Sequence, residues 1–206
     1  MWSRGKSIPV PVDSMSETKR IFIGGVGYTN LRDLSVGPAV VQELKRLDWP
    51  AGVEIDDLSL GGPIAAVHRF REAPLYERVV LFGAVGRARQ PGQIYCYRWD
   101  GHLPDRDEIQ MRVAESVTGV ISLDNLLIVG GFFGIWPPDV VVIEVEPLEE
   151  DWGPEFSEPV RAAITPLIQA VRRATLASLD DLSTSPDAAW ETDLSLPERK
   201  GKADRQ

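Results

Sequence analysis

Apolar residues recur along this chain in two patterns that alternate with each other. Short apolar or alternating runs predict strands at residues 20–23, 53–56, 78–82, 93–99 and 139–145. Longer segments carry apolar residues at three- and four-residue spacing and predict helices at 36–47, 64–70, 122–132 and 160–176. The strand at 93–99 alternates more openly than the others and is expected at a sheet edge. Together the pattern predicts an α/β fold, a three-layer sandwich with a mostly parallel sheet and helices on both faces.

This alternation occupies the middle of the chain, and we expect a single domain at residues 19–177. Residues 1–18 contain Pro9, Pro11 and several serine and basic residues, which is typical of a flexible leader. In residues 178–206 the apolar period ends and aspartate, serine, proline and charged residues dominate. That composition predicts a disordered tail.

Composition and charge exclude several classes of function. The formal net charge of −9 and the lack of a basic cluster argue against a nucleic-acid-binding protein. No apolar run approaches the roughly 18 residues of a membrane span, and the N-terminus lacks a signal-peptide pattern. The single cysteine, Cys96, excludes an internal disulfide and lies in a predicted strand, where a buried thiol is expected. We therefore expect a cytoplasmic protein with neither a nucleic-acid nor a membrane partner.

The loop after the first predicted strand is rich in glycine, with Gly25, Gly27 and Gly37 close together. In an open parallel sheet, ligands bind beyond the carboxyl ends of the strands, so this loop is a candidate site. Glycine lets the backbone turn tightly or approach a ligand closely, and a phosphate cradle is one interpretation. The spacing matches neither the dinucleotide-binding fingerprint nor the P-loop, which disfavours that interpretation.

The same loop resembles the opening motif of the [NiFe]-hydrogenase maturation endopeptidases. In that family a strand is followed by G-x-G-N and, a few residues later, by D-(D/E)-x-x-G at the start of a helix. Matching places are occupied here by Gly25, Gly27, Asp33 and Gly37.

Two later segments add to the resemblance. Residues 53–57, followed by Gly61 and Gly62, resemble the second strand of the family and its glycine-rich turn. Glu146 begins a Glu-Pro pair like the one common near the end of a late strand in the family. The resemblance covers about residues 20–175 and implies the phosphorylase/hydrolase-like form of the three-layer sandwich.

The resemblance also implies where a metal ion would be held. In the family an acidic residue, an aspartate and a histidine bind a metal ion, and the enzyme cuts the C-terminal tail of the hydrogenase large subunit. These positions fall on Leu34, Gly83 and Gly119, whose side chains carry no donor atom. Divalent metals need carboxylate, imidazole or thiolate ligands, so we expect no metal site and no cofactor.

These observations favour a non-catalytic relative of the maturation proteases that binds a protein partner. The expected partner is a [NiFe]-hydrogenase large subunit or another assembly factor, bound in the crevice that holds substrate in the family. We expect no catalytic residues. The candidate crevice residues are Asp33, Asp57, Gly61, Gly62 and Glu146.

Two alternatives stay open. An active metal-dependent endopeptidase would need a relocated metal site, for which the candidates are Asp33, His102, Asp124 and Glu146. A small-molecule-binding α/β protein would use the glycine-rich loop, since a fold does not fix a function. Simpler roles are available too: Asp33 at a helix N-terminus, Asp124 as a helix cap and His102 in a polar surface loop.

Overall fold

The computed structural model describes residues 19–73, 75–119 and 121–177. The leader and the tail expected from the sequence lie outside these residues and stay predictions. The described strands are β1 (Ile21–Val26), β2 (Val53–Asp57), β3 (Arg78–Ala84), β4 (Ile94–Arg98) and β5 (Val140–Val145). The described helices are a short 3₁₀ turn, η1 (Arg32–Ser35), α1 (Val36–Leu44), α2 (Gly62–Glu72), α3 (Arg106–Val117), α4 (Leu123–Phe132) and α5 (Glu158–Leu176).

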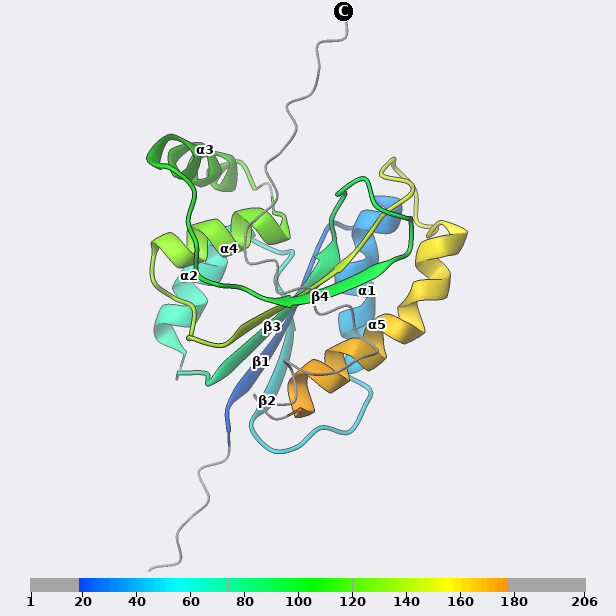
Figure 1. The fold of residues 1–206 in the computed structure, drawn as a ribbon, viewed down its shortest axis with the longest axis horizontal. Helices are drawn as coiled ribbons and strands as arrows, with labels where there is room; N and C mark the ends of the chain where they lie inside the picture. Colours follow the sequence, from blue (N-terminus) through cyan, green and yellow to red (C-terminus); the bar gives the residue numbers. More distant parts are fainter. Residues whose placement is uncertain (1–18, 74, 120, 178–206) are drawn as a thin grey trace, which may run out of the picture.

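The strands form one sheet in the order β2-β1-β3-β5-β4 (Figure 1). Neighbouring strands are parallel except for β4 and β5, which are antiparallel. β4 lies at an edge of the sheet, as its openly alternating sequence predicts. Helices α1 and α5 cover one face, and α2 and α4 cover the other (Figure 1). The predicted three-layer α/β sandwich with a mostly parallel sheet is confirmed.

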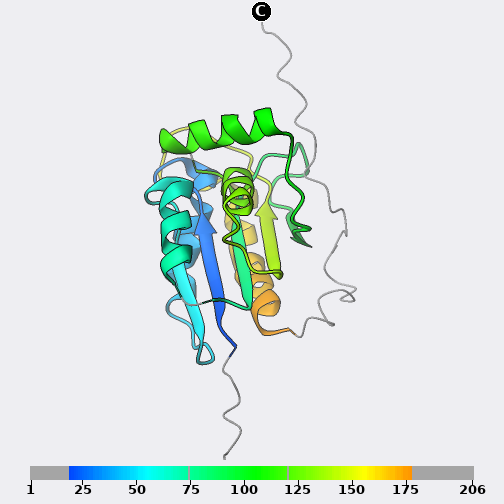
Figure 2. The ribbon, with the colours of Figure 1, turned by 90° about the vertical axis from the view of Figure 1, so that its left-hand side faces the viewer.

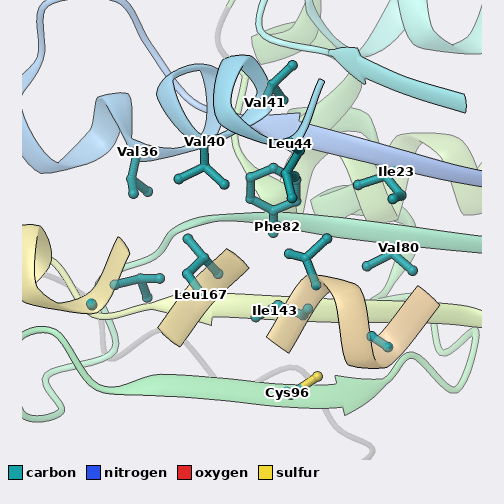
Figure 3. Close-up of a cluster of buried hydrophobic side chains, with 14 of the residues drawn as sticks. Ile23, Val36, Val40, Val41, Leu44, Val80, Phe82, Cys96, Ile143 and Leu167 are labelled. Atoms are coloured by element: carbon teal, nitrogen blue, oxygen red, sulfur yellow. The ribbon is translucent and has the colours of Figure 1, made fainter. Parts of the chain in front are cut away.

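Two apolar clusters fill the space between the layers. The first lies between the sheet and helices α1 and α5 and includes Leu44, Phe82 and Ile143 (Figure 3). The second lies between the sheet and helices α2 and α4 and includes Phe22 and Leu81. β3 therefore contributes to both clusters, which explains why its sequence is a continuous apolar run rather than an alternating one.

Most element boundaries agree with the sequence prediction to within a few residues. Helix α1 ends at Leu44 rather than at residue 47. The carbonyl oxygen of Leu44 accepts a hydrogen bond from the indole Nε1–H of Trp49 at 2.8 Å. Cys96 is buried in β4, as expected, and burial raises the pKa of its thiol. None of the helices in the described part of the chain has the length and hydropathy of a membrane span.

The hydrophobic pattern does not predict α3, because this helix buries no apolar stripe. Its buried residues are Arg112 and Ser116. The signal that does mark α3 is Asp105, whose carboxylate accepts hydrogen bonds from the backbone N–H groups of Asp107 and Glu108. The helix packs on α2 and α4 and lies toward the carboxyl ends of the parallel strands (Figure 2).

Candidate functional site

The carboxyl ends of β1 and β3 mark the candidate site. The chain leaves β1 through α1 on one face of the sheet and reaches β3 through α2 on the other face, so the strand order reverses between β1 and β3. In open α/β sheets, ligands bind at such a reversal. The two loops that meet there are residues 27–35, after β1, and residues 85–93, after β3.

The glycines of the first loop bring the chain's own backbone together. A β-carbon on Gly25 would lie 2.6 Å from the carbonyl oxygen of Gly37. One on Gly27 would lie 2.3 Å from the carbonyl oxygen of Leu34, and one on Gly37 would lie 2.2 Å from that of Val26. Glycine is therefore required for the first turn of α1 to pack closely on the end of β1. Because protein atoms fill this space, the phosphate-cradle interpretation is disfavoured.

Of the three positions that the resemblance assigns to metal ligands, the backbone constrains Gly83 and Gly119. A β-carbon on Gly83 would lie 2.4 Å from the carbonyl oxygen of Val26, because β1 and β3 pair up to these two residues. Gly119 has a φ of +83°, a left-handed conformation that residues with side chains rarely adopt. The carbonyl oxygen of Leu34 accepts a hydrogen bond from the N–H of Tyr28 at 3.0 Å. At Gly83 the fold leaves no room for any side chain.

Replacing Gly83 by aspartate is therefore expected to destabilise the fold rather than to rebuild a metal site. The new β-carbon would push against the backbone of Val26, and we expect a loss of about 3 kcal/mol in the free energy of unfolding. Urea denaturation measures the loss, and calorimetric titration with nickel measures metal binding. The control is Gly86→Ala, because a β-carbon there would meet the movable carboxylate of Glu150 at 3.1 Å. A Gly83→Asp variant as stable as the parent would contradict this geometry.

A buried guanidinium lies beside the carboxyl end of β5, on the α4 side of the sheet. Arg87 donates to the two carboxylate oxygens of Asp124 at 2.7 and 3.1 Å. It also donates to Glu144 from Nη2 at 2.8 Å and from Nε at 3.4 Å. Its backbone N–H donates to both carboxylate oxygens of Glu146, at 2.9 and 3.0 Å. We call these four residues the arginine–carboxylate cluster.

The charges of this cluster are almost fully removed from water. The side chains of Arg87, Asp124 and Glu144 are 8%, 9% and 2% exposed. Burial by itself lowers the pKa of Arg87, but the hydrogen bonds that its guanidinium donates to Glu144 and Asp124 outweigh burial and raise that pKa above its usual range. Burial, followed by the charge of Glu144, raises the pKa of Tyr97. The Tyr97 hydroxyl therefore stays protonated and donates to Glu144 at 2.9 Å, and Arg89 donates to the same carboxylate at 3.0 Å.

Chemically, the arginine–carboxylate cluster acts as a clamp. Each of its three carboxylates already accepts hydrogen bonds, and its members come from the loop after β3, from the end of β5 and from α4. A buried arginine held in this way stabilises a fold only when its partners are all in place. The cluster thus joins three segments and leaves none of its carboxylates unengaged for acid–base chemistry.

Asp33 holds a different loop. Its side chain is fully buried and accepts hydrogen bonds from the backbone N–H groups of Leu148, Glu149 and Ser157 at 2.8, 2.9 and 2.8 Å. The hydroxyl of Ser157 donates to it at 2.7 Å. The interpretation that the Asp33 carboxylate binds the N-terminal N–H groups of the helix that follows it is wrong, because the carboxylate makes no capping hydrogen bond to η1 or α1. It instead fixes the loop between β5 and α5, which is 115 to 124 residues away along the chain.

The remaining crevice candidates lie at the β2 edge of the sheet. Asp57 accepts a hydrogen bond from the N–H of Ser59 at 2.8 Å, within its own turn. Gly61 and Gly62 have φ values of +84° and +69° and begin α2. Glu146 follows β5, three strands away from β2 in the sheet. The structure therefore distributes the predicted crevice residues over separate parts of the carboxyl edge.

The structure also places the residues proposed for a relocated metal site. Asp124 does not cap its helix, since the hydroxyl of Ser122 accepts from the N–H of Asn125 and so performs that role. His102 is exposed in a surface loop, where its backbone N–H donates to the carboxylate of Asp100. Within residues 19–73, 75–119 and 121–177, no group of three or more His, Cys, Asp or Glu residues is arranged to hold a metal ion.

Arg87 is the residue of the site that the sequence analysis missed. A signal was present, because Glu144 lies on an otherwise apolar strand and Glu146 directly follows it, and a buried carboxylate needs a donor. The loop after the neighbouring strand β3 supplies two arginines, Arg87 and Arg89. Pairing these acids with that loop would have required knowing that β5 lies beside β3.

Comparison with known proteins relates this architecture to one group of solved structures. The chain matches the crystal structure of a hydrogenase 2 maturation peptidase from Thaumarchaeota archaeon SCGC_AB-539-E09 with a TM-score of 0.54 and 24% identity, over 76% of this chain and 97% of that one. It matches the hydrogenase maturating endopeptidase HybD from E. coli with a TM-score of 0.54 and 22% identity, over 74% and 89% of the two chains. It matches the [NiFe] hydrogenase maturation protease HybD from Thermococcus kodakarensis with a TM-score of 0.52 and 17% identity, over 76% of this chain and 99% of that one.

These matches define the class of fold. The protein has a five-stranded, mostly parallel α/β architecture of the kind found in the hydrogenase maturation peptidases. The matches cover most of each relative's length, so the whole domain is shared rather than a fragment of it. The sequence matches no known family profile and no curated protein.

Proposed function

We propose that this protein is a non-catalytic member of the hydrogenase maturation protease family that binds a protein partner. The observation that carries the proposal is Gly83, which stands where the resemblance places a metal-binding aspartate. It has no donor atom, and the carbonyl oxygen of Val26 occupies the space that a side chain would need. A metal-dependent peptidase needs a metal site with an open coordination position, and Gly83 can supply no ligand to such a site.

The partner that this proposal favours is a [NiFe]-hydrogenase large subunit or another assembly factor, met in the cytoplasm. The shared fold supports the choice, since the solved structures it resembles are named for hydrogenase maturation. A chain that keeps this scaffold without metal ligands retains the surface around the carboxyl ends of the strands. That surface includes Asp57 and Gly61, which are not fully buried.

Two observations disfavour the alternatives. A relocated metal site would have to use Asp124 and Glu146, whose oxygens are held by Arg87. A small-molecule site in the glycine-rich loop would need space that the backbone of α1 fills at Gly27 and Gly37.

The test is a paired experiment on the full-length protein. We expect calorimetric titration with nickel, zinc and cadmium to show no stoichiometric binding. Co-expression with a [NiFe]-hydrogenase large subunit is expected to give a complex in which the subunit keeps its C-terminal tail. The positive control is the E. coli endopeptidase that shares the fold, in the same two assays. Stoichiometric metal binding together with removal of the tail would replace the proposal with an active protease.

A further inference from the structure

The loop between β5 and α5 presents two large apolar side chains to solvent. We call residues 147–157 the Trp152 loop. Within it Trp152 is 78% exposed and Leu148 is 54% exposed. Tryptophan side chains are largely buried on average, and tryptophan is enriched among the residues that dominate binding at protein interfaces.

Hydrogen bonds on both sides of Trp152 hold the backbone of this loop. Asp33 accepts three of the loop's backbone N–H groups and the hydroxyl of Ser157. Arg32 adds a contact on each side of Trp152: its backbone N–H donates to the carbonyl oxygen of Gly153 at 2.9 Å, and its guanidinium pairs with Glu149. A loop whose backbone is already ordered loses little backbone conformational entropy when a partner binds, which favours affinity.

The charge around Trp152 indicates the chemistry of the partner. The loop contains four acidic residues and neither lysine nor arginine. In the described part of the chain, Glu150, Asp151 and Glu155 take part in no salt bridge, whereas Glu149 pairs with Arg32. The nearest base along the chain beyond the loop, Arg161, donates to a backbone carbonyl oxygen. Carboxylates beside an exposed indole favour a cation, since the face of tryptophan also attracts one.

We propose that the Trp152 loop is a docking surface for a basic segment of a partner protein, in which lysine or arginine alternates with apolar residues. A cationic side chain lies over the Trp152 indole, an apolar neighbour contacts Leu148, and Glu150 and Asp151 receive the flanking positive charge. The inference rests on the proposed function only in taking the partner to be a protein. It holds whether or not that partner belongs to a hydrogenase.

The probe is a capped synthetic peptide of sequence Gly-Lys-Leu-Gly-Lys-Leu-Gly, added to the full-length protein. We expect two-dimensional NMR to show a shift of the Trp152 indole N–H, and calorimetry to give the affinity. Trp152→Ala is expected to weaken binding about tenfold. The double variant Glu150→Gln, Asp151→Asn is expected to weaken it about fivefold at low salt, with a smaller effect at high salt.

Matched controls distinguish binding at the Trp152 loop from non-specific binding of the peptide. Leu148→Ala is compared with Leu176→Ala, because the two leucines are 54% and 50% exposed but Leu176 ends α5. Only the first is expected to weaken binding. A second peptide carries glutamate in place of each lysine and is expected not to bind.

Three results would overturn the inference. They are an unchanged affinity of the Trp152→Ala variant, equal binding of the glutamate peptide, and sedimentation showing that Trp152 mediates a dimer of this chain. Co-purification of a hydrogenase subunit that is insensitive to Trp152→Ala would support the proposed function and show that this subunit binds elsewhere, so the three results above decide the docking surface. Peptide binding at Trp152 without any complex with such a subunit would support the docking surface and exclude the hydrogenase large subunit as the partner in the proposed function.

Discussion

Replacing Arg87 by alanine is expected to destabilise the protein by about 3–5 kcal/mol, the cost typical of breaking a buried ion pair from one side. The variant would leave the carboxylates of Asp124 and Glu144 buried without their main donor. Urea denaturation followed by circular dichroism measures the change. The control is Arg46→Ala, because Arg46 and Glu43 form an exposed pair whose loss should cost less than about 1 kcal/mol.

The same variant has a second expected property. Removing the guanidinium leaves two carboxylates, from Asp124 and Glu144, facing the space that it occupied. Divalent cations prefer such oxygen ligands, so millimolar manganese is expected to recover part of the lost stability of Arg87→Ala and to leave the parent unchanged. Equal stability of Arg87→Ala and the parent, without any added cation, would show that the cluster does not clamp the fold.

Replacing Asp33 by alanine is expected to cost a similar amount, about 3–5 kcal/mol, for a different reason. Four hydrogen-bond donors would lose their acceptor, and an unsatisfied buried donor costs about 1–3 kcal/mol. The effects are less than additive, because the loop can relax toward water. Hydrogen exchange at the amides of Leu148, Glu149 and Ser157 is expected to accelerate more than exchange in β3.

The control for this prediction is Asp33→Asn, which keeps one acceptor oxygen and should lose less stability. A selective loosening of the Trp152 loop should also weaken binding of the basic peptide, although Asp33 itself is buried and out of the peptide's reach. If hydrogen exchange in the loop is unaffected by Asp33→Ala, the carboxylate does not position the loop.

The fold was predictable from the sequence because each of its strands and α-helices except α3 shows a local pattern. Strand β3 is an unbroken apolar run since both of its faces are covered, and α1 shows its buried stripe through Val36, Val40 and Leu44. Such patterns depend on residues a few positions apart, which a sequence displays directly. Helix α3 was not predicted because it buries no apolar stripe and instead buries Arg112, which donates to Asn125 of α4 and to Glu108 within α3.

The candidate site was less predictable because its contacts join distant parts of the chain. Asp33 and Glu146 were identified as residues of interest, but their partners were not. The donors to Asp33 lie more than 100 residues away, and Arg87 and Glu144 are 57 residues apart. The resemblance assigned the metal-ligand positions to residues without donor atoms, and that assignment stays a prediction. The resemblance gave no indication that the carbonyl oxygen of Val26 would occupy the space that a side chain at Gly83 needs.

The position of β5 in the sheet has a consequence for the newly made chain. β4 pairs with β5 alone, although β5 begins 42 residues after β4 ends. At ordinary rates of translation this interval takes roughly 2–8 s, during which β4 has left the ribosome without its pairing partner. An unpaired strand edge is prone to aggregation, so during its synthesis this protein should depend on chaperones most while residues 94–140 emerge.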